Sequence, residues 1–310
     1  MEKLLKALND FNDESTQEIP LDSIGSWQET RHAVEKDDIL AMIAAMGSQR
    51  ALLLSGDPGV GKSHLARVAA SITERFFIST VIKPDDEIDD LLWKIDHTQR
   101  LSDAQFAAAS KQKFSKELKC YLRPGPIWHA FQQPEDDLTS EYNPASQEAK
   151  HESGVVLLID EIDKANVALL NSLLEVLGNM SFEVPILGKT IHNRTKPPLI
   201  IMTSNGDRTL PAPLLRRCVC HEVILPKREY AFIKRMKLIA KAKMLDKYDK
   251  DVAKTCAKII YRQRDSQNHY NPGASEFVDM LNALQAMQAV DSKAQTEDHL
   301  LAIQKYFLKS

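Results

Sequence analysis

The residues with the clearest chemical potential run from Gly56 to Ser63 and read GDPGVGKS. They match the pattern Gly-x-x-x-x-Gly-Lys-Ser/Thr, which binds phosphate groups when it joins a strand to a helix. Glycine lets such a loop curl until its backbone N–H groups point at phosphate oxygens, at the positive end of the following helix. We therefore expect Lys62 to contact the β and γ phosphates and the Ser63 hydroxyl to bind Mg²⁺.

A second candidate site follows the apolar run from Val155 to Ile159, which ends in Asp160 and Glu161. Two carboxylates at the end of a buried strand are costly to leave unpaired, so a metal ion or a substrate is their natural partner. We expect Asp160 to hold Mg²⁺ and Glu161 to polarise the attacking water as general base. Together with the phosphate loop, the acidic pair predicts an enzyme that hydrolyses ATP, with ATP and Mg²⁺ as cofactors.

A third apolar run, from Leu199 to Met202, leads into Thr203-Ser204-Asn205. Ser-Asn-Gly after a strand is usually only a turn. Its position after the acidic strand and an intervening helix favours a catalytic interpretation, in which Asn205 orients the attacking water beside the γ-phosphate.

The segment Arg216-Arg217-Cys218-Val219-Cys220-His221 allows two incompatible interpretations, a metal site or a pair of working arginines. The cysteines and the histidine lack the second ligand pair that zinc sites usually have. Alternation along 218–224 also fits a strand, in which successive side chains point to opposite faces and cannot converge on one metal ion. We therefore predict that a helix ends at the arginines and that the cysteines begin the last strand of a sheet.

Strands and helices must alternate to position these residues. Residues 51–54 form an apolar strand before the phosphate loop, and an amphipathic helix follows it. The run before Asp160 is apolar without alternation, which is typical of a central strand in a parallel sheet buried on both faces. A helix behind it has core-facing leucines at helical spacing; these are Leu169, Leu170, Leu173, Leu174 and Leu177. The fold class is therefore α/β with a central parallel sheet.

The composition is that of an ordinary globular protein. The chain has 310 residues, 43% of them apolar, and a formal net charge of -3, so nothing in the overall charge attracts nucleic acid. No apolar run approaches the roughly 18 residues that suggest a membrane span, and the first residues lack the core of a signal peptide. The four cysteines have no disulfide-framework spacing, which fits a reducing compartment. We expect a cytoplasmic protein without a membrane segment.

With these motifs, the chain resembles AAA+ ATPases and, more narrowly, their MoxR-like branch. GDPGVGKS resembles the Walker A motif of the family, VVLLIDEIDKA its Walker B motif and IIMTSN its sensor 1. SFEVPILGKTIHN is similar to the hairpin before sensor 1, YLRPGPIWHAF to the segment after the helix-2 insertion, and LPAPLLRRC to the arginine-finger element. The resemblance covers residues 26–284.

The resemblance implies three parts. They are an N-terminal helix and connector over 1–25, a P-loop α/β domain over 26–225 and a small all-helical lid over 226–310. Within the second part we expect the helix-2 insertion near 100–125 and a polar loop over 132–154.

The resemblance also implies a ring of identical subunits, expected to be hexameric, with ATP held between neighbours. Nucleotide-binding residues would be those of the loop and the first helical turn; these are Gly56, Asp57, Pro58, Gly59, Val60, Gly61, Lys62, Ser63 and His64. A neighbour would donate an arginine to the γ-phosphate. Arg217 is the better candidate because in related proteins this arginine stands directly before a Phe or Cys, and Arg216 is the alternative.

One departure concerns the lid. Many members of the family carry a second sensor arginine in the segment that corresponds to residues 271–278, and no arginine stands there. Either Arg262 or Arg264 substitutes for it, or the coupling of the lid to ATP is weakened, which is the interpretation we favour.

Three functions follow from these features. The first is a chaperone-like ATPase that remodels a protein partner, as MoxR-like proteins do with partners that carry a von Willebrand factor A domain. The second is a nucleic-acid-directed ATPase, such as a helicase loader, a transposition regulator or a restriction or phage-defence component. The lysine-rich segment 227–258 supports it, whereas the negative net charge opposes it. The third is a nucleotide-gated scaffold that hydrolyses little.

Overall fold

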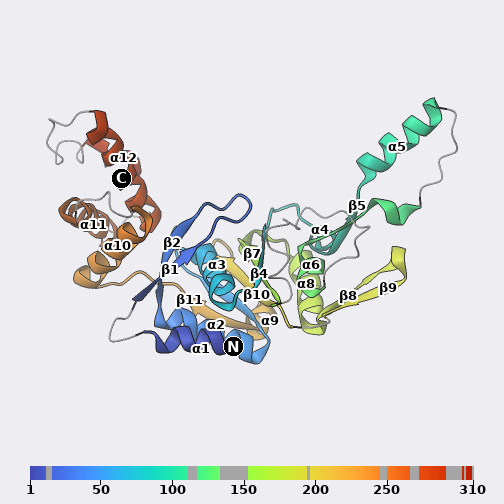
Figure 1. The fold of residues 1–310 in the computed structure, drawn as a ribbon, viewed down its shortest axis with the longest axis horizontal. Helices are drawn as coiled ribbons and strands as arrows, with labels where there is room; N and C mark the ends of the chain where they lie inside the picture. Colours follow the sequence, from blue (N-terminus) through green and yellow to red (C-terminus); the bar gives the residue numbers. More distant parts are fainter. Residues whose placement is uncertain are drawn as a thin grey trace. The chain divides into compact units, whose positions relative to one another are not determined.

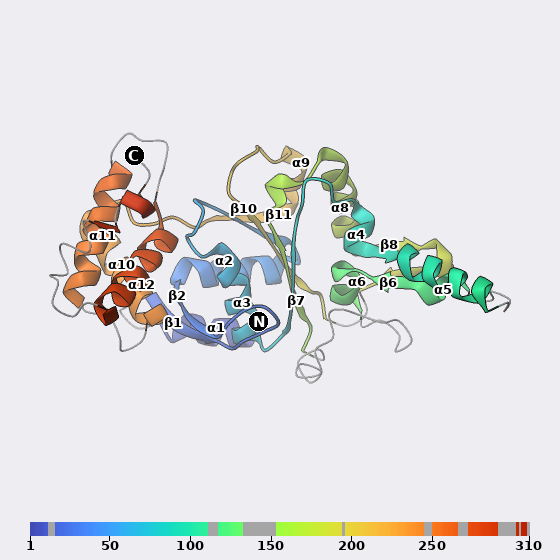
Figure 2. The same cartoon turned by 90° about the horizontal axis from the view of Figure 1, so that it is seen from above.

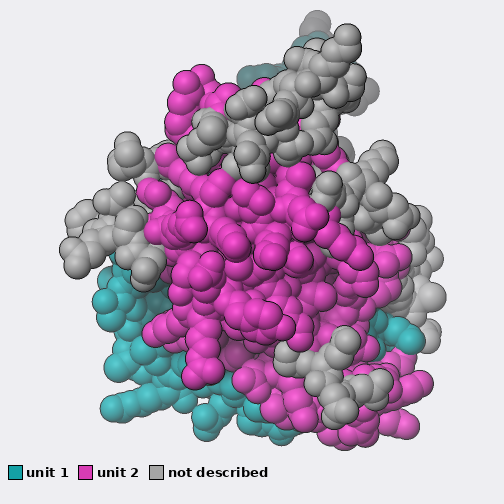
Figure 3. Space-filling model, turned by 90° about the vertical axis from the view of Figure 1, so that its left-hand side faces the viewer, with its two compact units in different colours: residues 1, 42–53, 69–220 teal, residues 2–41, 54–68, 221–310 magenta. Residues whose placement is uncertain are grey.

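The computed structural model describes residues 1–11, 16–110, 117–132, 153–193, 196–244, 250–265, 272–290, 302–303 and 305–308. These residues divide into two compact units, which are coloured separately in Figure 3. Unit 1 contains Met1 and residues 42–53 and 69–220, whereas unit 2 contains residues 2–41, 54–68 and 221–310. Each unit is described by itself.

A five-stranded sheet has the order β11-β3-β10-β7-β4. Its strands are β3 (Ala51–Ser55), β4 (Phe76–Val81), β7 (Val155–Asp160), β10 (Leu199–Ser204) and β11 (Cys218–Glu222). In unit 1, β7 runs parallel to both β4 and β10, with Leu157 opposite Ile78 and Ile200. Residues 155–159 are all buried, as expected for an apolar strand covered on both faces. The predicted central parallel sheet is confirmed.

Helices α6 (Pro126–Phe131) and α8 (Val167–Asn179) pack into the core of unit 1. The α8 helix begins where the Asn166 side chain accepts a hydrogen bond from the Leu169 N–H at 2.8 Å, which satisfies one unpaired donor of the first turn. Four of its predicted core leucines are buried and Leu177 is partly buried. The helical spacing of these leucines therefore marked a core helix, as predicted.

Two smaller parts of unit 1 extend from the side that carries α6 and α8 (Figures 1 and 2). The first is the insertion, made of α4 (Ile88–Leu92), β5 (Trp93–Ile95), α5 (His97–Ala109), η1 (Leu118–Tyr121) and β6 (Leu122–Pro124). The second is an antiparallel hairpin, made of β8 (Ser181–Val184), η4 (Pro185–Leu187) and β9 (Lys189–His192). The hairpin turns through η4 and Gly188. Most of the predicted polar loop, residues 133–152, lies outside the described residues.

Unit 2 contains the helical C-terminal region, which is α10 (Glu229–Met244), α11 (Lys250–Asp265) and α12 (Ala274–Val290). The three helices lie together in both ribbon views (Figures 1 and 2) and share an apolar core that includes Phe232, Cys256 and Phe277. The helical nature of this region is confirmed, whereas its predicted boundary at 226 stays a prediction.

The N-terminal part of unit 2 begins with α1 (Glu2–Asn9), close to the helix predicted there. Half of the predicted connector is instead a strand, β1 (Thr16–Leu21), which pairs with β2 (Thr30–Glu35) in an antiparallel hairpin. The connector is polar and contains Pro20, so its sequence alone does not resemble a strand. Residues 16–21 form a strand because they pair with β2, not because of their own strand propensity.

The remaining elements span both units: α2 (Lys36–Ser48) and α3 (Lys62–Thr73) each begin in unit 2. In unit 2, His221 Nε2 lies 2.8 Å from Asp38 Oδ1, while Asp38 Oδ2 accepts a hydrogen bond from the Glu35 N–H. Asp38 is only 5% exposed. The hydrogen bond with Asp38 raises the pKa of His221, although burial opposes this shift.

Replacing His221 by glutamine is therefore expected to destabilise the fold in a pH-dependent way. A raised folded-state pKa stabilises the fold fully below the unfolded-state pKa of about 6.5, and this stabilisation is lost as the pH rises through the folded-state pKa. We expect a loss of about 1–2 kcal/mol at pH 5.5 and a smaller loss at pH 9. Urea unfolding at both pH values measures the change in the free energy of unfolding. His192→Gln, on exposed β9, is the control, and an equal loss at both pH values would contradict the prediction.

Candidate functional site

The phosphate loop lies in unit 2, between the end of β3 at Ser55 and the start of α3 at Lys62. Gly61 has a φ of +99°, and a Cβ at this position would lie 2.5 Å from Cε1 of His32. Only glycine combines this backbone conformation with so close a neighbour. The predicted order of strand, loop and helix is present, and the loop precedes the N-terminus of a twelve-residue helix, where backbone N–H groups attract anions.

Lys62 is buried inside the loop, with a 6% exposed residue surface. Its Nζ donates to the carbonyl oxygens of Gly56 at 2.7 Å and Asp57 at 2.9 Å. The loop thus folds around an ammonium group that two of its own carbonyls hold. The predicted contact of Lys62 with phosphates stays a prediction.

The helical part of unit 2 contacts the same loop. Arg264 Nη2 lies 2.7 Å from Asp57 Oδ2, and Arg264 Nη1 donates to the Pro272 carbonyl at 2.8 Å. Val60 is buried in the apolar core of the C-terminal helices. Arg262, the other arginine considered, is exposed. Of the two arginines, Arg264 is the one that joins the helical region to the phosphate loop.

Replacing Arg264 by alanine is expected to weaken the binding of ATP about tenfold. The Asp57 carboxylate would then stand uncompensated beside the bound phosphates, and because Asp57 is 40% exposed the repulsion is screened to about 1 kcal/mol. Titration with a fluorescent ATP analogue measures the change.

Two companion variants make this test specific to charge. Asp57→Asn in the Arg264→Ala background removes the repulsion and is expected to restore most of the affinity. Arg262→Ala, on the same helix, is expected to bind the analogue as the wild type does. If the Arg262→Ala and Arg264→Ala proteins bound the ATP analogue with equal affinity, the Arg264–Asp57 ion pair would have no effect on nucleotide binding.

His64 lies in a cluster of rings rather than beside Lys62. Its ring stacks on His32 with centroids 5.5 Å apart, meets Trp27 edge-on, and its Nε2 lies 3.3 Å from Lys243 Nζ. Burial, followed by the charges of Lys243 and Arg67, lowers the pKa of His64 to about 4. The ring is neutral near pH 7 and ties α3 to the β1–β2 hairpin and to α10. Its predicted contact with nucleotide stays a prediction.

The acidic residues lie in unit 1, where β7 ends at Asp160. The Thr203 hydroxyl, in the neighbouring strand β10, donates to Asp160 Oδ1 and accepts a hydrogen bond from the Glu161 N–H at 2.9 Å. Thr203 is 2% exposed. The sequence analysis missed this residue, although a polar side chain near the end of an otherwise apolar strand was a visible signal.

Glu161 has a φ of +59°, a left-handed conformation that is rare for residues other than glycine. Such strain clusters at functional sites, where the surrounding structure maintains it. The carboxylate pairs with Lys164, with 2.5 Å between Oε2 and Nζ, and this contact raises the pKa of Lys164. To act as a general base, the Glu161 carboxylate has to separate from Lys164 and accept a hydrogen bond from water instead.

Asn205 follows β10 directly, and its backbone is anchored by a second residue that the sequence analysis missed. Asp163 Oδ2 accepts hydrogen bonds from the N–H groups of Asn205 at 3.1 Å and Asp207 at 3.0 Å. Asp163 is 2% exposed. The segment after the acidic strand therefore fixes the turn that carries Asn205.

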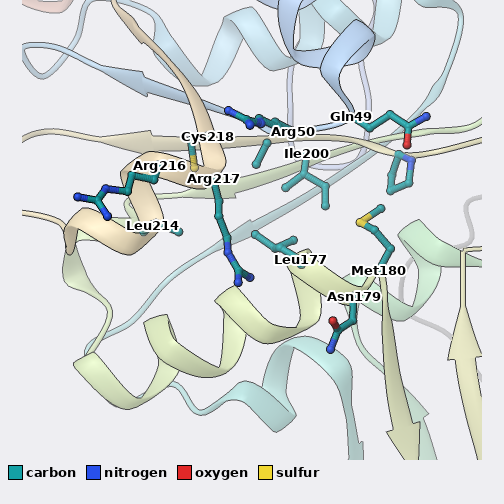
Figure 4. Close-up of a pocket in the computed structure, with 13 residues that line it drawn as sticks. Gln49, Arg50, Leu177, Asn179, Met180, Ile200, Leu214, Arg216, Arg217 and Cys218 are labelled. Carbon is teal, nitrogen blue, oxygen red and sulfur yellow. The ribbon is translucent and has the colours of Figure 1, made fainter.

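The paired arginines end α9 (Ala212–Arg217), and β11 begins at Cys218, as predicted. They line an open pocket of about 330 Å³ in unit 1 (Figure 4). Its other lining residues are Gln49, Arg50, Ala51, Leu177, Gly178, Asn179, Met180, Pro198, Ile200, Leu214 and Cys218. The lining contains three arginines and no carboxylate, so the pocket attracts anions.

The metal interpretation of this segment fails in the part of the chain that the structure describes. Cys218 is buried, which raises the pKa of its thiol to about 12, whereas Cys220 is exposed. His221 is engaged with Asp38. No three His, Cys, Asp or Glu side chains come together to hold a metal ion among the described residues.

Comparison with known proteins shows one family. A family model described as "AAA domain (dynein-related subfamily)" matches residues 51–218, which is more than half of the chain. No curated protein matches the sequence.

Solved structures of RuvB from Thermotoga maritima are similar to this chain. The structure described as a Holliday junction branch migration motor is 17% identical, with a TM-score of 0.48, over 87% of this chain and 67% of that chain. Two variants of the same protein are 19% and 18% identical, with TM-scores of 0.49 and 0.48, over 87% of this chain and 68% and 67% of theirs. Among the described residues, no helix has the length and apolar character needed to cross a membrane.

Proposed function

Because the chain belongs to the AAA domain family, in its dynein-related subfamily, we propose that it is a Mg²⁺-dependent ATPase of the MoxR-like branch. In this proposal, subunits assemble into a hexameric ring and use ATP hydrolysis to remodel or activate a protein partner. The observation that carries the proposal is Lys62, a buried ammonium group held by two carbonyls inside a glycine-rich loop at a helix N-terminus.

The residues of the loop, from Gly56 to Ser63, bind the phosphates in this proposal. Ser63 and Asp160 would hold Mg²⁺, since a hydroxyl and a carboxylate are the hard oxygen donors that this ion prefers. When bound, the metal ion would neutralise charge on the phosphate oxygens.

The chain's own residues supply the remaining chemistry. Thr203 holds Asp160 in one orientation through its hydroxyl. After the Glu161 carboxylate has separated from Lys164, it accepts a proton from the attacking water, and Asn205 orients that water. The strained backbone at Glu161 and the Asp163 anchor below Asn205 support these roles.

A protein partner fits the surface of the insertion in unit 1. The α5 helix has no buried residue, and Leu101 and Phe106 on it are 60% and 71% exposed. In this proposal a protein partner covers these two side chains. We propose a partner with a von Willebrand factor A domain, as the MoxR-like resemblance implies.

The alternative is a nucleic-acid-directed ATPase, favoured by the lysine-rich segment 227–258. ATP turnover by the purified chain, measured from 0.1 to 20 µM protein with and without DNA at two salt concentrations, separates the possibilities. Turnover per chain that rises with concentration and does not respond to DNA is the result expected for a ring that acts on protein. Salt-sensitive stimulation by DNA would favour the alternative, and absence of turnover at every concentration would leave only a nucleotide-gated scaffold.

A further inference from the structure

The two arginines at the end of α9 have different surroundings, which indicates different tasks. We infer that Arg216, rather than Arg217, reaches the nucleotide of a neighbouring subunit, and that Arg217 is a positioning residue that holds α9 against α8. This inference rests on the proposed function and reverses the preference that the sequence suggested.

The guanidinium of Arg217 is already engaged within its own subunit. Its Nη1 donates to the Leu174 carbonyl oxygen in α8, and Figure 4 shows the side chain extended toward that helix. A backbone carbonyl oxygen has two lone pairs, so the Leu174 oxygen can accept this hydrogen bond in addition to one from its own helix. A bound Arg217 would have to give up this contact to reach another subunit.

Gly178, in the last turn of α8, makes room for this contact. A Cβ at Gly178 would collide with Nη1 and crowd the rest of the Arg217 guanidinium. Its φ is not in the left-handed region, so the backbone itself does not require glycine here. A side chain at Gly178 would therefore displace the Arg217 guanidinium from the position it has in the structure.

Arg216 has the opposite properties. Successive residues of a helix point about 100° apart, so the two side chains cannot share one direction. In Figure 4, Arg216 points away from α8. Both arginines have exposed residue surfaces, but among the described residues Arg216 has no hydrogen-bond or ion-pair partner, whereas Arg217 donates to Leu174. The pocket around it contains Arg50 and no carboxylate, so its positive charge stays available to a phosphate.

The shortness of α9 explains why an anchor is needed. The helix has six residues, and only Leu214 among them is buried. A short helix with one apolar contact holds an exposed side chain loosely, whereas a transferred phosphoryl group needs an arginine in a defined position. The Arg217 contact with α8 supplies the second attachment point beside Arg216.

Substitution by lysine separates the two roles in assembled protein. Arg216→Lys and Arg216→Ala are each expected to lower kcat at least 100-fold, because a lysine lacks the forked guanidinium that binds phosphate oxygens. Arg217→Lys keeps a donor for Leu174 and is expected to retain at least a third of the wild-type kcat. Arg217→Ala and Gly178→Ala should both lower kcat about tenfold with little change in KM. Arg100→Ala, on exposed α5, is the matched arginine control.

Thermal unfolding tests the anchor independently of turnover. Arg217→Ala is expected to lower Tm by about 3–5 °C. Gly178→Ala should lower it less, because alanine favours the helix and offsets part of the lost contact, and Arg216→Ala should leave it unchanged. Unchanged Tm in both anchor variants would overturn the role of Arg217, even if the wild type hydrolyses no ATP and the proposed function fails.

Mixed assemblies test the role of Arg216 across subunits. Arg216→Ala and Lys62→Ala proteins, each inactive alone, should regain activity when mixed, because some interfaces then contain an intact loop and an intact arginine. Absence of recovery from subunits that still co-assemble would overturn the role of Arg216. The role of Arg216 would also be overturned if the Arg216→Ala protein hydrolysed ATP while the Arg217→Lys protein, with a normal Tm, did not.

Discussion

Replacement of Lys62 by alanine is expected to abolish ATP binding and turnover, with at least a 100-fold loss of each. The ammonium is the one side-chain cation that the structure places inside the phosphate loop, held by the carbonyls of Gly56 and Asp57. Its removal takes away a positive charge, on a residue only 6% exposed, that the proposed function places against the phosphates, where it would offset their negative charge. Calorimetric titration with ATP and a phosphate-release assay measure the two losses.

The control for this prediction is Lys83→Ala, because Lys83 is an exposed lysine that follows β4. It is expected to bind and hydrolyse ATP as the wild type does. The Lys62→Ala protein should remain folded, with Tm lowered by only a few degrees, since the loop loses two hydrogen bonds to carbonyls that water can reach. Wild-type turnover by the Lys62→Ala protein would contradict both the site and the proposed function.

Glu161→Gln is expected to have the second largest effect, a fall in kcat of about 10²–10⁴ without loss of ATP binding. An amide has nearly the size and shape of the carboxylate but cannot accept a proton from water at neutral pH, and general-base catalysis contributes about this factor. The loss of the ion pair with Lys164 should change stability by less than about 1 kcal/mol, because both side chains are partly exposed. Single-turnover hydrolysis separates the chemical step from ATP binding.

The matched substitution is Glu183→Gln, at the exposed residue of β8, which is expected to leave kcat unchanged. The Glu161→Gln protein should also stay in its ATP-bound assembly, so it can capture the protein on which the ring acts. Isolation of the assembly with ATP, compared with the Lys62→Ala protein treated in the same way, identifies partners whose binding depends on nucleotide. A Glu161→Gln protein with wild-type kcat would remove this residue from the mechanism.

Much of the candidate site was predictable because its motifs are contiguous in sequence. The strand before the phosphate loop, the loop and the helix after it are neighbours along the chain, and glycine and lysine at this spacing have few other uses. The acidic end of β7 and the strand that begins at Cys218 were also predictable, since the length and alternation of apolar residues identify strands.

Residues that act through contacts distant in sequence were not predictable in this way. Thr203 meets Asp160 because β10 pairs with β7 in one register. Arg264 meets Asp57 across 207 residues of sequence, and the sequence analysis favoured weakened coupling because no arginine stood at the expected position. A guanidinium can reach the same loop from the preceding helix, and only packing determines whether it does.

The sequence by itself determined the family, the strand–loop–helix around the glycine-rich motif and the acidic end of a buried strand, because these depend on residue type and short spacing. The tertiary structure alone decided which groups hold those residues in place. It also decided that Arg217 donates to a carbonyl of α8, while Arg216, which is exposed like Arg217, has no partner among the described residues. Two adjacent arginines are chemically equivalent in sequence. They become different only when a neighbouring helix presents a carbonyl, and a glycine without a side chain, to one of them.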